Sequence, residues 1–358
     1  MEHIVEQKCP SCGAPLRYDP AQGVLVCDYC GTVAEIAPKA GTTEVGVQGL
    51  DFETLNEQAT NEGAAPLPIY NCVSCGAEVI APAEQAALTC PYCGNNIVLT
   101  DKVSGKLRPD GVIPFRIDSK QLPGAMKAFY KGKALLPKRF FSESTMGKVT
   151  GVYVPFWIFD GRLTGRLDFH AERPDSHRSG DYEVTETRHF QESRQVEVAF
   201  ADLPVDASGR IDDKLMDSLE PFRIGEAKPF DLRYLAGFTA DRFDQAKEDV
   251  APRAERRMAN TAEAAAASTI SGRYRNVRQT GGELRAELTA RYMLLPVYLF
   301  SITHGGKAYD FAVNGQTGKV VGNIPTDKGV SFRYFLLRAG GAAAVVIIGA
   351  VVKYLLGG

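Results

Sequence analysis

The sequence contains few of the residues and motifs from which catalytic sites are commonly built. Its five histidines are scattered through polar or turn segments, where we interpret each as a solvated surface residue: His3, His170, His177, His189 and His304. There is no G-x-x-x-x-G-K-[ST] phosphate loop, no G-x-S-x-G nucleophile elbow and no H-E-x-x-H metalloprotease motif. We therefore predict no catalytic residue, no cofactor-binding residue beyond metal ligands, and a protein that is not an enzyme. An enzyme of unknown class within residues 100–325 stays open as an alternative.

The sequence also lacks an apolar run at its start and a strong net charge. Residues 1–10 are polar and do not resemble a secretory signal peptide. This polar start favours a location in the reducing cytosol. The net charge of −2 argues against a polyanion-binding protein overall. Residues 102–148 nevertheless carry eleven basic residues and three acidic ones. The basic side chains of this stretch either contact phosphates, of lipid or of nucleic acid, or form a solvated helix face. We interpret Arg253, Arg256 and Arg257, further along the chain, as solvated.

The cysteines, in contrast, follow a duplicated pattern. All eight lie in C-x-x-C pairs, fourteen residues separate the two pairs of each half, and a glycine, expected at positive φ, follows every pair. In a reducing compartment this spacing favours zinc over disulfides, and four thiolates around Zn²⁺ leave no open position for a substrate. We predict two structural Zn²⁺ ions, with rubredoxin-like iron as the alternative. The ligands are Cys9, Cys12, Cys27 and Cys30 for one ion, and Cys72, Cys75, Cys90 and Cys93 for the other.

Each set of cysteines predicts a zinc ribbon, which is a small β unit stabilised by its metal. The fourteen residues between knuckles are too few to bury a hydrophobic core, so metal binding must supply the folding free energy. We place zinc ribbon 1 at residues 1–37 and zinc ribbon 2 at residues 69–100, each with two short strands. Residues 38–68 between them are rich in Gly, Thr, Glu, Asn and Ala and are predicted to be a flexible linker.

Residues 101–325 have the pattern of an α+β domain with a mainly antiparallel sheet, formed as one fold or as two. Apolar spacing and polar boundaries predict helices near residues 119–133, 212–219 and 244–268. Apolar and aromatic runs predict strands within residues 151–169, 182–200, 283–303 and 308–313, with a hairpin turn at 304–307.

The last segment, residues 326–358, predicts one C-terminal transmembrane helix. Residues 339–352 carry no charge, and apolar residues on both sides extend the helix to about 33 Å if Arg338 and Lys353 snorkel. Basic residues are more frequent before the span than after it, which predicts a single-pass protein of the cytoplasmic membrane with its N-terminal bulk in the cytoplasm. A buried core helix is the alternative. The predicted fold class is therefore two small metal-stabilised β ribbons, an α+β domain and this membrane anchor.

Several stretches of the sequence resemble bacterial TFIIB-type zinc-ribbon proteins. They are CPSCG at residues 9–13, LRPDGVIPF at 107–115, GVYVPFWIFD at 151–160 and VNGQTGK at 313–319. Members of that group are often labelled primosomal or helicase-like, but this sequence has no helicase motor. The resemblance implies a membrane-anchored partner of SPFH-domain and phage-shock-type membrane proteins in envelope stress.

Together these observations predict a non-enzymatic, membrane-anchored zinc-ribbon adaptor or scaffold. It would recruit protein partners at the cytoplasmic face of the membrane, with membrane lipid as a further contact. The alternative is a zinc-ribbon protein that binds nucleic acid. That alternative requires basic residues on the ribbons, yet only Arg17 is basic between Cys9 and Cys30, and no residue is basic between Cys72 and Cys93.

Overall fold

The structure is a computed structural model, dominated by β-strands. It describes residues 4–5, 8–36, 69–71, 78–80, 85–89, 96–99, 108–133, 135–137, 140, 149–272, 274–325 and 328–356.

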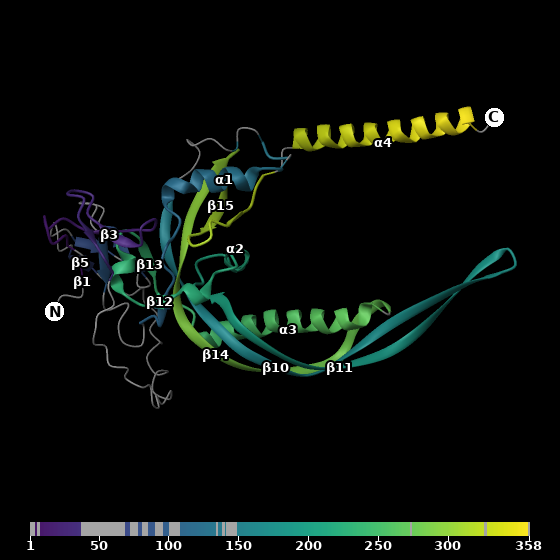
Figure 1. Ribbon diagram of the computed structural model, residues 1–358, viewed down its shortest axis with the longest axis horizontal. Helices are drawn as coiled ribbons and strands as arrows, with labels where there is room; N and C mark the ends of the chain where they lie inside the picture. Colours follow the sequence, from purple (N-terminus) through teal and green to yellow (C-terminus); the bar gives the residue numbers. More distant parts are fainter. Residues whose placement is uncertain are drawn as a thin grey trace.

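Three very long strands form the centre of the fold: β10 (Thr150–Ser179), β11 (Tyr182–Asp206) and β14 (Arg275–His304). β10 lies between the other two and is antiparallel to both. Figure 1 shows these strands as a long bow, with the β10–β11 hairpin reaching past the end of the helix that the bow holds. Apolar or small residues alternate with polar ones over residues 161–171 of β10 and 283–292 of β14, as expected for a sheet with one buried face. Residues 152–159 and 292–300 are apolar throughout and mostly buried.

Helix α3 (Lys247–Ser271) fills the concave face of this bow (Figure 1). Its buried residues recur every four positions and include three alanines, so one narrow stripe of small side chains faces the strands: Val250, Ala254, Met258, Ala262, Ala266 and Ile270. This stripe packs against Leu163, Leu167 and Phe169 of β10 in one core cluster. The small alanine side chains let the helix approach the sheet closely.

Strands β10 and β14 come into tight contact at Gly282. This glycine has a φ of +104°, and a Cβ atom there would lie 2.2 Å from the carbonyl oxygen of Arg166. A side chain at this position would therefore collide with the backbone of the neighbouring strand.

The other end of the bow is thickened by shorter elements. β14 continues into β15 (Lys307–Asn314) and β16 (Val320–Gly322), and it also pairs in parallel with β9 (Gly111–Val112). Helices α1 (Leu122–Tyr130) and α2 (Asp213–Ser218) each contribute to a core cluster, as do the 3₁₀ turns at Ile224–Glu226 and Leu232–Leu235. The short strand β12 (Lys228–Pro229), which pairs with β9, and a 3₁₀ turn at Ser119–Gln121 contribute no buried residue.

The N-terminal part forms two small sheets and also contributes strands to the main sheet. β2 (Arg17–Asp19), β3 (Val24–Val26) and β4 (Val33–Ala34) make one sheet, and β5 (Ile69–Asn71) and β6 (Glu78–Ile80) make another. β7 (Gln85–Thr89) and β8 (Asn96–Leu99) instead belong to the eleven-stranded main sheet, with β1 (Ile4–Val5) beside β8 and β13 (Thr239–Asp241) between β7 and β10.

The predicted fold class is therefore wrong. Two strands of the second predicted ribbon, β7 and β8, belong to the main sheet. Ala86 and Ala87 of β7 are fully buried, and Ala87 lies in the same core cluster as Tyr153 and Leu294. A strand pair too short to bury a core of its own completes its burial against the large sheet.

The predicted membrane anchor is also wrong. Helix α4 (Lys328–Leu356) extends away from the body in Figure 1, but none of the described helices is long and apolar enough to cross a bilayer. The uncharged stretch between Arg338 and Lys353 covers fourteen residues, or about 21 Å against a hydrocarbon core of about 30 Å. The prediction of a single-pass protein of the cytoplasmic membrane is wrong for the same reason.

The order of helices and strands after residue 108 agrees closely with the sequence patterns. The predicted helices correspond to α1, α2 and α3, and Gly305 and Gly306 form the predicted hairpin turn with positive φ. The strands are much longer than predicted, because polar residues that interrupt the apolar pattern lie on the exposed part of the bow.

Candidate metal centre

The first two C-x-x-C pairs fold into two knuckles of the same geometry. Gly13 and Gly31 have φ values of +73° and +72°, and each donates its backbone N–H to the carbonyl oxygen of the cysteine four residues earlier, at 2.9 Å. The first knuckle precedes β2 and the second joins β3 to β4. The predicted positive φ after each cysteine pair is thus confirmed for these two glycines, and the backbone turns its amides toward the sulfurs.

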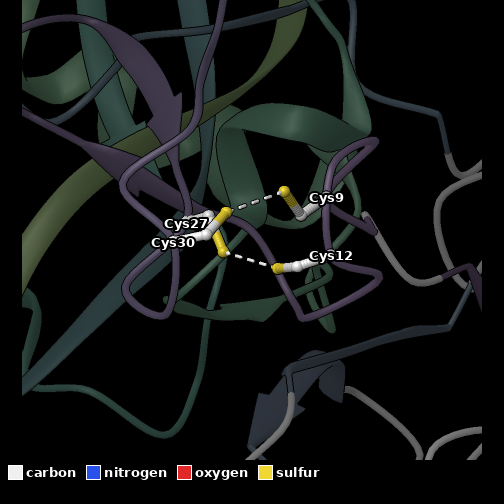
Figure 2. Close-up of side chains that lie close together, drawn as sticks. All are labelled: Cys9, Cys12, Cys27 and Cys30. Atoms are coloured by element: carbon white, nitrogen blue, oxygen red, sulfur yellow. Dashed lines mark hydrogen bonds between the residues drawn. The ribbon is translucent and has the colours of Figure 1, made fainter.

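The four sulfur atoms of Cys9, Cys12, Cys27 and Cys30 converge from these knuckles. All lie within 4.8 Å of one another. Cys9 Sγ is 3.5 Å from Cys30 Sγ, and Cys12 Sγ is 3.5 Å from Cys27 Sγ, as Figure 2 shows. A tetrahedron of sulfurs around a zinc ion at about 2.3 Å has edges of about 3.8 Å. The cluster can therefore hold a metal ion with only small movements of its side chains.

Hydrogen bonds around the cluster shift the pKa values of Cys9 and Cys12 in opposite directions. Burial raises the pKa of Cys9, but N–H groups of Ser11 and Cys12, together with Thr32, outweigh it and lower the pKa to about 6. The backbone of Ala14 lowers the pKa of Cys12, yet the neighbouring sulfurs of Cys30 and Cys27 raise it to about 12. Four thiolates this close repel one another, so all four ionise together only around a cation.

The cluster of four cysteines is anchored to the body of the protein. Cys9 and Cys27 are buried and share a core cluster with Leu16, Leu25 and Tyr18. Cys12 and Cys30 are exposed. The cluster therefore lies at a surface, with one pair of sulfurs facing inward.

The other predicted metal ligands, Cys72, Cys75, Cys90 and Cys93, lie outside the described residues, as do the glycines at positions 76 and 94. The strands next to them, β5 to β8, are described and pair as two hairpins. The second zinc site stays a prediction from the duplicated spacing.

Comparison with known proteins gives one clear relationship. The chain is 33% identical over 339 residues, covering 94% of this chain and 95% of the relative, to the uncharacterized protein YdjG of Bacillus subtilis (strain 168). The chain belongs to the YdjG family. No protein-family model matches the sequence, and no solved structure matches it.

The single basic residue of the first cysteine segment is neutralised in this member of the YdjG family. Arg17 donates two hydrogen bonds to the carboxylate of Asp28, at 3.2 and 3.1 Å. This ion pair compensates the charge of Arg17.

Two histidines that we interpreted as isolated surface residues lie together in this YdjG-family fold. His170 and His189 come from neighbouring strands and meet beside Glu172. The sequence offers only a weak signal for this cluster: an H-x-E pattern in a strand puts both side chains on one face, but the partner strand's register is needed to add the second histidine.

Proposed function

We propose that the chain is a non-enzymatic zinc-ribbon adaptor that binds a protein partner through its second knuckle. Cys9, Cys12, Cys27 and Cys30 would hold one Zn²⁺ ion with all four positions occupied by sulfur, a closed arrangement that supports structure and not hydrolysis. The repeated spacing extends the proposal to a second Zn²⁺ at the other four cysteines.

The observation that carries this proposal is an exposed aromatic side chain on the knuckle. Tyr29 lies between two metal-binding cysteines and is 80% exposed, and Val33 of β4 is 54% exposed. A large amphipathic ring on a loop fixed by a metal loses little entropy on binding, and tyrosine is enriched among the residues that dominate protein interfaces. These two residues form the proposed contact surface.

The neighbouring backbone offers a second contact of the same kind. β4 pairs with β3 on one side and with no other strand that the structure describes. Its outer edge could accept a strand from the partner, with Val33 and Tyr29 beside it. Nucleic acid is disfavoured, because Arg17 is already bound by Asp28.

The test replaces the contact surface without touching the metal ligands. A photoreactive residue at position 29 is expected to crosslink to a partner in cells, and the same residue at position 182 is not. Tyr182 is a matched control because it is 78% exposed on the distant hairpin tip.

The crosslinked protein is then purified and its affinity is measured directly. Tyr29→Ser is expected to weaken binding by about 2 kcal/mol, or roughly thirtyfold, with unchanged zinc content, whereas Tyr182→Ser leaves the affinity unchanged. Equal affinities of the wild type and Tyr29→Ser would refute this surface. Retardation of DNA by the full chain at physiological salt, lost in Arg17→Ala, would favour the nucleic-acid function instead.

A further inference from the structure

A second group of metal-ligating side chains lies far from the cysteines, on the long hairpin. His170 and Glu172 are two residues apart on β10, and Glu172 pairs across the ladder with His189 of β11. His189 Nδ1 is 3.2 Å from His170 Nε2. Glu172 Oε1 lies 3.7 Å from His170 Nε2 and 3.9 Å from His189 Nδ1. Three potential ligand atoms therefore face a common centre.

The carboxylate is held in this orientation by a residue from the third strand. The ladder between β10 and β14 shifts register between His170 and Glu172, so that β14 bulges there, and Asn276 has a φ of +51°. From this bulge Asn276 Nδ2 donates to Glu172 Oε2 at 2.6 Å. Bulges commonly redirect a side chain in this way. One carboxylate oxygen is thus fixed, and the other is left toward the two imidazoles.

This arrangement has the features of a metal site with a supporting shell. Metal-binding carboxylates are usually oriented by a second hydrogen bond, and Asn276 supplies it here. Two imidazoles and one carboxylate suit divalent first-row transition metals.

The distances agree with that chemistry. Two nitrogens bound tetrahedrally at about 2.05 Å lie about 3.3 Å apart, close to the 3.2 Å between the two histidine nitrogens. The carboxylate oxygen is a few tenths of an ångström further out and would move inward on binding. We propose that His170, Glu172 and His189 form a binding site for a divalent transition metal ion such as Zn²⁺, Co²⁺ or Ni²⁺.

The site differs from the cysteine cluster in having an open position. Three protein ligands leave at least one position for water or an added ligand, and the His189 side chain is 60% exposed. The simpler arrangement is a hydrogen bond between two stacked imidazoles, whose ring centroids are 5.2 Å apart. That arrangement requires no metal and predicts no affinity for one.

The absorption spectrum of bound Co²⁺ distinguishes the site at His170, Glu172 and His189 from the cysteine sites. The full chain is first given two equivalents of Zn²⁺ under reducing conditions, one for each set of four cysteines, and is then titrated with Co²⁺. The proposal expects one further equivalent to bind, with visible d–d absorption but without the charge-transfer band that thiolate ligands produce. His189→Gln and Glu172→Gln are each expected to weaken this binding by more than about 100-fold.

Two further variants make the test specific. Asn276→Gly keeps a residue that tolerates positive φ but removes the amide, and it is expected to cost about 10- to 100-fold in affinity. His177→Gln changes an exposed histidine further along β10 and should leave the titration unchanged. Circular dichroism checks that every variant retains its strands. Absence of the extra equivalent in the wild type, or equal Co²⁺ affinity in wild type and His189→Gln, would overturn the proposal.

Discussion

The backbone N–H of Tyr18 donates a hydrogen bond to the carbonyl oxygen of Ala236, at 2.9 Å. This contact joins the first cysteine hairpin to the loop that precedes β13. The ring of Tyr18 is only 3% exposed and meets Tyr234 edge-on, with centroids 5.6 Å apart. The first cysteine hairpin and the body of the protein therefore share one hydrophobic core.

Replacing this ring should measure how strongly the two parts are joined. Tyr18→Ala leaves a cavity in the shared core, and we expect it to lower the free energy of unfolding by about 3–5 kcal/mol in urea denaturation. Tyr18→Phe keeps the ring and should stay within about 0.5 kcal/mol of the wild type. If both variants unfold alike, the packing of this ring does not hold the ribbon in place.

Removal of the metal should open the knuckles selectively. With a strong chelator, the amides of Gly13 and Gly31 should lose their protection from hydrogen exchange, because the cation no longer holds the thiolates together. Amides in the centre of β14 serve as the internal control and should stay protected. Added Zn²⁺ should restore the knuckles. Unchanged exchange at both glycines after complete metal removal would show that the hairpin folds without an ion.

The close approach of β10 and β14 at Gly282 can be tested by two neighbouring substitutions. Gly282→Ala forces a Cβ atom to within 2.2 Å of the Arg166 carbonyl at a φ of +104°, and we expect a loss of more than about 1 kcal/mol in stability. Gly281→Ala is the matched control, since the nearest atom to its Cβ is 4.0 Å away. It should change the unfolding free energy by no more than about 0.5 kcal/mol. Similar effects of the two substitutions would contradict this account.

A buried ion pair connects α3 to the end of β11. Asp206 is fully buried and bonds Arg253, which also contacts Asp213 and Asp217. Arg253→Met would leave the Asp206 carboxylate without its cation and should cost about 3–5 kcal/mol in urea denaturation. The double variant Arg253→Met with Asp206→Asn should recover most of that loss. No recovery would mean that the arginine acts through packing and not through its charge.

The raised pKa of Asp206 predicts how the stability of the protein changes with pH. Burial raises the pKa of Asp206 above its usual 3.8, although Arg253 opposes this effect. The folded state then favours the protonated form, so this contribution to stability is complete below pH 3.8 and declines as the pH rises through the folded-state pKa. Asp206→Asn lacks the decline, and its stability relative to the wild type should increase over that range in a series of urea titrations. A difference that is flat with pH would refute the raised pKa.

Local patterns in the sequence predicted most of the individual elements but not their assembly. The C-x-x-C-G pattern determines both knuckles, because their hydrogen bonds and positive φ involve residues within five positions of each other. The joining of β7 to β13 could not be predicted, since the pairing of Ala87 with Ala240 connects segments more than 150 residues apart and neither has a distinctive composition.

The partners of charged residues likewise could not be predicted from local sequence. Arg253 and Arg257 look like the solvated face of a helix, yet both are mostly buried and bind acidic residues from α2 and its flanks, at Asp213, Asp217 and Glu220. Whether an arginine meets water or a carboxylate depends on which element crosses the helix, and that information is not local.

The long outer edge of β11 has a consequence for the behaviour of the protein at high concentration. β11 pairs with β10 and with no other described strand, so much of its outer edge presents backbone donors and acceptors that no strand pairs. Near the end of β11, Arg257 of α3 donates to the carbonyl oxygen of Pro204. Such an edge invites polymerisation with a second molecule. Exposed charges along it oppose this, since an approaching copy would have to desolvate Glu183, Glu186, Arg188 and Glu197. The charged side chains therefore raise the free-energy cost of pairing a second copy along this edge.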